Sequence, residues 1–234
     1  IQIGEKEFPD YALNKDFFLR WSHSQDPKAR PNSRFSANVN AGSSSYFRNN
    51  ITSSSADFLS NTFQSSVAYS RSWKNSNLSV NLTHSQNTLQ KTVDLGLPDI
   101  SYNVNRFSPF RRKHRSGEEK WYEKIGVSYA ASALNRIQTY DSLLFNKTTL
   151  QDFKNGIRHS VPISTSFRVF KYFSLTPSVG YSQRWYMTGI QKRWDADQDT
   201  LITETVKGFR MVQDIGTSVS LNTKLFGMYQ FRNS

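Results

Sequence analysis

Long stretches of the chain alternate apolar residues with small polar ones. Between residues 32 and 42, Phe35, Ala37 and Val39 fall on one side of an extended chain and Asn38 on the other. The same period of two recurs in three further stretches, at 77–85, 161–169 and 215–225. Because successive side chains of a β-strand point to opposite faces, this period predicts strands.

The polar side of these stretches is unusual. It consists mostly of Ser, Asn, Thr, Gly and Gln, and carries few of the Lys and Glu residues typical of a sheet face in water. A wide, hydrated interior lined by small uncharged groups fits this composition, and so does a sheet whose apolar face contacts lipid.

The alternation predicts nine strands, at 14–22, 32–44, 61–73, 77–88, 93–108, 120–136, 156–170, 173–187 and 206–229. Apart from a modest connection near Asn87, the connections alternate in length: short turns near 27, 75, 114 and 171, long loops near 52, 146 and 197. The last loop is expected to cover Thr188 to Thr205. Outer-membrane barrels have short periplasmic turns and long external loops. We therefore expect an all-β, antiparallel, up-and-down transmembrane barrel, to which residues 1–234 contribute a single segment of about nine strands.

Composition supports a membrane barrel over a soluble globular protein. Of 234 residues only 36% are apolar and the mean hydropathy is −0.63, yet aromatic residues reach 14%. No apolar run approaches the ~20 residues of a helical span, and the aromatic content argues against disorder. In a transmembrane barrel only every second strand residue is apolar, and aromatic residues collect at the two membrane interfaces.

The net charge limits the classes of partner, and the cysteine content bears on disulfide bonds. The net charge of +12 suggests an anionic partner, either nucleic acid, phospholipid or a phosphorylated glycolipid. The sequence has no zinc-finger spacing and no RNA-recognition stretch, so we do not expect nucleic-acid binding. It has no cysteine, and hence no disulfide framework. Its last residues resemble a strand entering a turn, so we expect an internal piece of a longer barrel.

Aromatic residues gather where the predicted strands should cross membrane interfaces. The candidate girdle residues at the short-turn ends are Trp21, Trp73, Trp121, Tyr122 and Tyr172; those at a long-loop end are Trp185 and Tyr186. Trp and Tyr rings anchor at headgroup level, which favours two girdles. The alternative is that these aromatic residues simply fill a sheet core.

Charged residues suggest two kinds of contact. Arg111, Arg112, Lys113 and Arg115 form a candidate basic periplasmic turn, which either meets anionic groups or is neutralised by the following Glu118 and Glu119. Arg168 alternates with Phe167 and Val169, so it is expected to face the interior. There it contacts a phosphate of a passing amphiphile or pairs with an acid across strands. Arg34 is a second candidate for such a lumen contact.

Catalytic and metal-binding patterns are absent from the sequence. His23, His84, His114 and His159 are scattered, and no two have metal-ligand spacing. The stretch Trp194–Thr200 places Asp195, Asp197 and Asp199 as in a calcium loop, but lacks the loop's glycine and closing glutamate. We expect neither an enzyme nor a bound metal or cofactor. Pro98 follows Gly96 within one predicted strand and suggests a bulge there.

Several segments together resemble a known family. They are K-D-F-F-L-R-W-S-H-S-Q-D-P-K-A-R-P at Lys15, F-S-A-N-V-N-A-G-S-S-S-Y at Phe35, S-V-A-Y-S-R-S-W at Ser66, N-L-S-V-N-L-T-H-S-Q-N-T at Asn77, L-P-D-I-S-Y-N-V-N-R at Leu97 and G-E-E-K-W-Y-E-K-I-G-V-S-Y at Gly117. These are similar to the Bacteroidota-type lipopolysaccharide-assembly protein LptD, also called organic solvent tolerance protein.

The resemblance implies a function. Members form a large outer-membrane barrel that receives lipopolysaccharide from a periplasmic Lpt bridge and inserts it into the outer leaflet. The resemblance also implies contact with outer-membrane lipids and with an LptE-like lipoprotein in the lumen. Family members carry a periplasmic jelly-roll domain, which we do not expect in this chain, and paired cysteines, which it lacks.

Three alternatives remain open at this point. A passive porin or nutrient-uptake barrel shares the strand pattern. A soluble glycan-binding β-sandwich predicts a protein that needs no detergent. A barrel hydrolase requires a Ser or Asp beside His84 or His159.

Overall fold

A computed structural model of the chain describes residues 2–3, 12–13, 16–43, 45–46, 61–112, 114, 117–144, 146, 149, 152–170, 172–195, 199–224 and 226–227. Nearly all regular structure in this part of the chain is β. Two short strands, β1 (Gln2–Ile3) and β2 (Ala12–Leu13), pair with each other. The other ten strands form one sheet.

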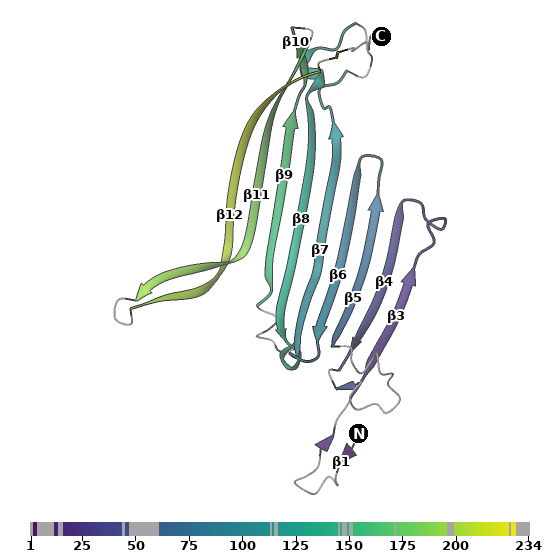
Figure 1. Cartoon of the computed structure of the whole chain (residues 1–234), viewed down its shortest axis with the longest axis vertical. Coiled ribbons are helices and arrows are strands. Elements are labelled where there is room, and N and C mark those ends of the chain that lie inside the picture. Colours follow the sequence, from purple (N-terminus) through teal and green to yellow (C-terminus); the bar gives the residue numbers. More distant parts are fainter. Residues whose placement is uncertain are drawn as a thin grey trace, which may run out of the picture. The chain divides into compact units, whose positions relative to one another are not determined.

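The large sheet is a meander. Its strands are β3 (Phe18–Ser24), β4 (Ser33–Gly42), β5 (Thr62–Ser72), β6 (Ser76–Asn87), β7 (Thr92–Phe107), β8 (Gly126–Tyr140), β9 (Lys154–Ser164), β10 (Phe167–Val169), β11 (Phe173–Asp195) and β12 (Thr200–Thr223). Each long strand lies beside its neighbour in sequence (Figure 1), and every register the structure defines is antiparallel. β10 pairs with β11, as does β12. The expected all-β, antiparallel, up-and-down sheet is therefore confirmed, and among the described strands it is not closed.

The alternation located the strands well but several of their ends poorly. The strand expected at 120–136 begins only at Gly126, because Trp121–Lys124 forms a 3-10 turn. The strand expected at 156–170 is interrupted between Ser164 and Phe167.

The expectation of a long loop from Thr188 to Thr205 is wrong. β11 and β12 pair from Phe173↔Thr223 to Asp195↔Thr200, so most of that stretch is a hairpin. A register shift lies between Tyr186 and Thr188, where β12 has two residues against one of β11. The stretch resembled a loop because it contains many charged residues, among them Lys192, Arg193 and Asp195. The connection at 108–125 is in turn longer than expected, so the segregation of loop lengths holds only in part.

β7 departs from strict alternation near Pro98. A Cβ atom on Gly96 would lie 2.5 Å from Oγ1 of Thr83 and 3.5 Å from a carboxylate oxygen of Asp99. Gly96 and Asp99 thus face the same side, although they are three residues apart. Residues three apart in a regular strand lie on opposite faces, so β7 is irregular where the Gly96–Pro98 sequence suggested a bulge.

Packing divides the chain into two units. Unit 1 comprises residues 1–73, 77–101 and 133–156; unit 2 comprises 74–76, 102–132 and 157–234. Among the described residues the buried apolar side chains are Ala37, Phe63, Val93 and Ile137, all of unit 1. In unit 2 the apolar side chains of β12 are open to the surroundings: Ile215 is 73% exposed and Val219 69%.

No helix in the described part of the chain combines the length and apolar character needed to cross a membrane.

Candidate functional site: the two faces of the sheet

Ladder registers assign side chains to faces, because directly paired residues share a face. In unit 1, Asn38 pairs with Ser66, which pairs in turn with Thr83. In unit 2, Ser178 pairs with Ser218, and their hydroxyl oxygens lie 2.6 Å apart. We call the face that carries these side chains the polar face of each unit, and the opposite one the apolar face.

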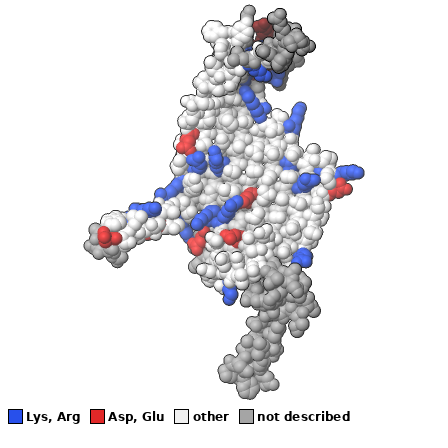
Figure 2. Space-filling model, in the orientation of Figure 1, with Lys and Arg blue, Asp and Glu red and all other residues white. Residues whose placement is uncertain are grey.

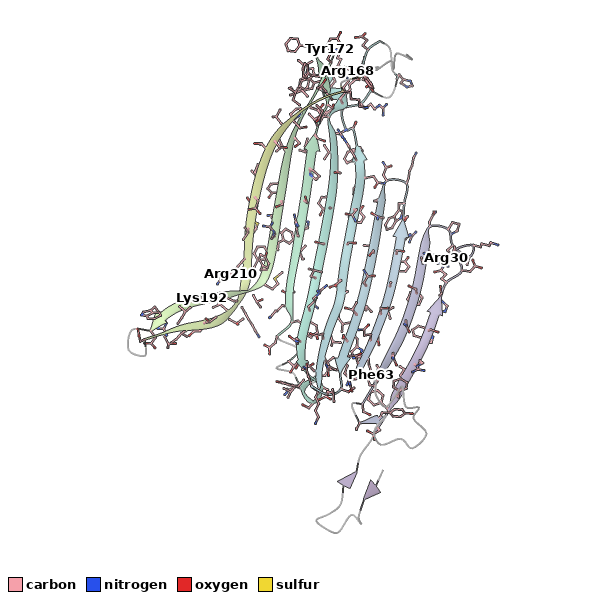
Figure 3. All side chains as sticks on the ribbon, viewed as in Figure 1. Arg30, Phe63, Arg168, Tyr172, Lys192 and Arg210 are labelled. Carbon is pink, nitrogen blue, oxygen red and sulfur yellow. The ribbon has the colours of Figure 1, made fainter. Side chains whose placement is uncertain are left out.

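The two arginines singled out from the sequence both lie on the polar face. Arg34 pairs with Ser70 in unit 1, and Arg168 pairs with Ser174 in unit 2. Figure 3 shows Arg168 near Tyr172 at one end of the β11 ladder. The residues belong to different units, so each is a separate candidate for contact with a polar ligand.

A groove of 790 Å³ indents the polar face of unit 1. Its polar lining includes Asn38, Gln64, Ser66, Thr83, Ser85 and Gln138. Four charged residues also line it: Asp94, Arg136, Asp152 and Lys154. Sequence reasoning missed this groove, because residues far apart in the chain converge on it. The one usable signal was that Asp94, Asp152 and Lys154 all lie close to strand ends.

Arg136, which lines the groove, forms an ion pair with a residue of β7. Its Nη2 donates to Oδ2 of Asp99 over 2.9 Å. The Asp99 side chain is only 17% exposed, and its other oxygen is buried without a partner among the described residues. Asn135 donates from Nδ2 to the carbonyl of Leu97 over 2.6 Å. Both contacts fix β8 against the irregular part of β7.

On the apolar face of unit 2, five rings form a row across five strands. The successive ring pairs and centroid distances are Tyr102–Tyr129 at 6.3 Å, Tyr129–His159 at 6.1 Å, His159–Trp185 at 4.4 Å and Trp185–Phe209 at 6.0 Å. Nδ1 of His159 lies 2.7 Å from the hydroxyl of Tyr129. His159 therefore belongs to an interstrand ring contact, which one sequence cannot reveal because it depends on register.

The predicted girdle residues lie as follows. Trp21 is 46% exposed, Trp73 44%, Trp121 66% and Tyr172 78%. Tyr122 packs edge-on against Trp121. These five lie at or near the turns at which they were predicted, except that Trp21 is inside β3.

Trp185 and Tyr186 were placed at the end of their strand, which is incorrect. Both lie within β11, beside the register shift, because the strand continues to Asp195. Whether any of these seven residues anchors in a membrane interface stays a prediction.

The candidate basic turn is internally neutralised where the structure describes it. Arg111 lies 3.6 Å from Glu119. Arg112 donates from Nε and Nη2 to the Glu123 carboxylate, and the backbone N–H of Lys120 donates to the same carboxylate over 2.8 Å. Glu123 is only 3% exposed, and these donors lower its pKa to about 2. Lys113 and Arg115 lie outside the described residues.

A serine does lie beside one histidine. Oγ of Ser65 is 3.3 Å from Nδ1 of His84. The same hydroxyl donates to the carbonyl of Asn40 over 3.0 Å and accepts from its N–H over 2.9 Å. No carboxylate contacts His84 within the described residues. The hydroxyl beside His84 is thus also held by both backbone groups of Asn40.

Acidic residues do not gather as a metal site would require. The described His, Asp and Glu side chains include no cluster of three that could hold an ion. Of the calcium-like loop, Asp195 and Asp199 are described, whereas Asp197 lies outside the described residues.

Comparison with known families gives one result for the whole chain. Residues 1–234 match the family model described as LptD protein. No curated protein matches the chain.

Proposed function

Since the match over its full length places this chain in the LptD family, we propose that its sheet is part of the wall of an outer-membrane translocon that inserts lipopolysaccharide into the outer leaflet. On this proposal the chain is an internal barrel segment of the Bacteroidota type, and its role is non-enzymatic.

The observation that carries the proposal is the contrast between the two faces. On the apolar face of β12, Ile215, Val219 and Leu221 are 73%, 69% and 59% exposed. On its polar face, Ser218 and Ser220 alternate with them. A soluble β-sandwich would bury one face against a second sheet, and the described residues form no second large sheet. Lipid on one side and water on the other accounts for both faces.

The same contrast suits an amphiphilic substrate. Small hydroxyl and amide groups, with Arg34, Arg168 and the groove beside Arg136, offer hydrogen bonds to sugars and phosphates. Acyl chains remain close to the lipid on the other side of the wall. The overall basic charge favours a phosphorylated glycolipid.

The two edge strands of the sheet have unpaired backbone groups that need hydrogen-bond partners in lipid. β3 and β12 each have a neighbour on one side only among the described strands. An unsatisfied backbone group in lipid costs on the order of several kcal/mol. We propose that further barrel strands complete the wall, with an LptE-like lipoprotein in the lumen and a periplasmic Lpt bridge supplying the substrate.

The first experiment asks whether the intact protein is a membrane barrel. It is expected to fold only in detergent or lipid and to change its gel migration on boiling. A protein that is folded and water-soluble without detergent would contradict the proposal.

The second experiment separates a translocon from a passive pore. A photoreactive amino acid replaces Ser178 on the polar face or, as the matched control, its neighbour Val179 on the apolar face. We expect crosslinks to lipopolysaccharide at 178 only while transport is active, and crosslinks to lipid at 179 regardless of transport. Ion conductance of the closed barrel without any transport-dependent crosslink at 178 would favour a porin or nutrient-uptake barrel instead.

A further inference from the structure

The β11–β12 hairpin changes character at the register shift between Tyr186 and Thr188. We call residues 188–195 and 200–207 the arm; its tip, 196–198, lies outside the described residues. Gly208 has φ +155°, and β12 accommodates two residues there against one in β11. Extra residues in a hairpin bend and twist it. Figure 1 shows the hairpin turning sharply at this point, and Figure 3 places Arg210 at the bend and Lys192 on the arm.

Gly189 leaves room for an arginine side chain at the bend. A Cβ atom on Gly189 would lie 2.5 Å from Nε of Arg210. The Arg210 side chain therefore crosses the arm where it leaves the rest of the hairpin, and occupies the space that any larger residue at 189 would need.

The two faces of the arm differ. One face carries Ile190, Lys192 and Trp194 from β11, with Leu201 and Lys207 from β12. Its three large apolar side chains are open: Ile190 is 64% exposed, Trp194 59% and Leu201 49%. Trp194 and Leu201 pair directly across the ladder.

The opposite face is more polar and carries the acids. It presents Gln191, Arg193 and Asp195 from β11 and Glu204 from β12. Its apolar members, Ile202 and Val206, are half-buried and not exposed. Lys192 and Lys207 thus lie on the same face as the exposed apolar side chains, whereas the carboxylates of Asp195 and Glu204 lie on the opposite face. Figure 2 shows Lys and Arg along this hairpin and acidic side chains toward its tip.

An exposed Trp and aliphatic side chains flanked by lysines fit a membrane interface. Indole rings settle at headgroup level, and lysines extend their ammonium groups to phosphates. A protein partner is less well matched, because a protein interface core is depleted of lysine.

From this juxtaposition we propose that the arm lies on the membrane surface, with Ile190, Trp194 and Leu201 inserted among the phosphate-bearing headgroups beside the barrel and Lys192 contacting those phosphates. The proposal rests on the proposed function only in requiring that the sheet is in a membrane. It adds a second lipid contact, parallel to the membrane plane, to the one made by the strands.

Because the chain contains no cysteine, single cysteines can report on each face. The intact protein, free of other cysteines, is labelled with an environment-sensitive fluorophore at Leu201→Cys or, on the opposite face, at Glu204→Cys. It is reconstituted in vesicles of brominated phosphatidylcholine and phosphatidylglycerol. Val179→Cys, on the apolar face of β11, is the reference for lipid contact.

We expect the label at 201 to be quenched several-fold more than the label at 204 and to shift to shorter wavelength. Lys192→Glu should lower the quenching at 201 in vesicles containing phosphatidylglycerol and leave it unchanged in pure phosphatidylcholine. Equal weak quenching at 201 and 204, with strong quenching at 179, would overturn the arm's placement alone. Absence of quenching at 179 in the folded protein would count against the membrane wall itself.

Discussion

Arg106 of β7 reaches across β8 at Gly126 to bond with β9. The Arg106 side chain fills the space that a Cβ atom on Gly126 would need, and its Nε is the atom nearest to that position. The guanidinium Nη2 donates to the carbonyl of Ser164, the last residue of β9, over 2.8 Å. The absent side chain at 126 thus lets one cation tie the ends of three strands.

Gly126→Ala should weaken this tie. The methyl group displaces the guanidinium, and the charge-assisted bond to Ser164 is lost. Arg106 is exposed, so we expect a loss of about 1 kcal/mol, at the low end for such bonds. Urea unfolding of the protein in lipid vesicles measures it. Gly216→Ala, where a Cβ meets nothing within 4 Å, is the control. In an Arg106→Ala background, Gly126→Ala should become neutral, and an undiminished loss there would contradict the account.

The Arg112–Glu123 contact predicts a pH dependence. The pKa of Glu123 is lowered from 4.5 to about 2, chiefly by its hydrogen bond with Arg112. A carboxyl whose folded-state pKa is lowered stabilises the fold fully above its unfolded pKa, and loses that effect as pH falls toward the folded one. Glu123→Gln should therefore be less stable than the parent at pH 7, and the difference should shrink between pH 4.5 and 2. The temperature of heat-modified gel migration, measured at each pH, follows it.

Glu119 offers the matched control for that titration. It is exposed and lies 3.6 Å from Arg111, so Glu119→Gln should leave the stability unchanged at every pH, as exposed pairs contribute little. A difference between parent and Glu123→Gln that stays constant from pH 7 to 2 would show that the ion pair is not its source.

The ring row predicts unequal effects of two similar substitutions. Tyr129→Phe removes the hydroxyl that lies 2.7 Å from Nδ1 of His159. It should destabilise the fold by about 1 kcal/mol, the usual net value of one hydrogen bond. Tyr102→Phe, in the next strand, removes a hydroxyl with no partner among the described residues and should be near neutral. Equal effects in urea unfolding would mean that the Tyr129–His159 bond contributes nothing.

The ion pair between Arg136 and Asp99 predicts that the contribution of Asp99 to stability depends on Arg136. Arg136→Met should leave a largely enclosed carboxylate unpaired and cost about 1–2 kcal/mol, since removing one partner exposes the desolvation cost of the other. Asp99→Asn in the same background should restore part of the stability. The double-mutant cycle measures this coupling, and additive effects of the two substitutions would rule it out.

Strand positions followed from local alternation, whereas strand pairing did not. Phe35, Ala37 and Val39 predicted β4 because the apolar or polar character of each residue indicates which face of the strand it occupies. The row from Tyr102 to Phe209 and the groove beside Arg136 depend on register between strands, which no single stretch of sequence encodes.

The errors have local physical causes. The segment after Tyr186 resembled a loop because its charged residues, above all the acidic ones near Asp195, hid the alternation. Glu123 was overlooked as the partner of Arg112 because Glu118 and Glu119 are nearer in sequence. The 3-10 turn that begins at Trp121 brings Glu123 back to Arg112, and an aromatic-rich stretch gave no sign of it.

On the proposed function, the wall is one sheet thick and neighbouring residues of a strand face different solvents. Inserting one residue within β6 or β12 would exchange the solvents of all residues between that point and the next turn, whereas inserting two would preserve them. Only irregular places, such as those at Pro98 and Thr188, can absorb an odd change. Relatives of this chain should therefore tolerate many substitutions along their strands, but vary in strand length by even numbers.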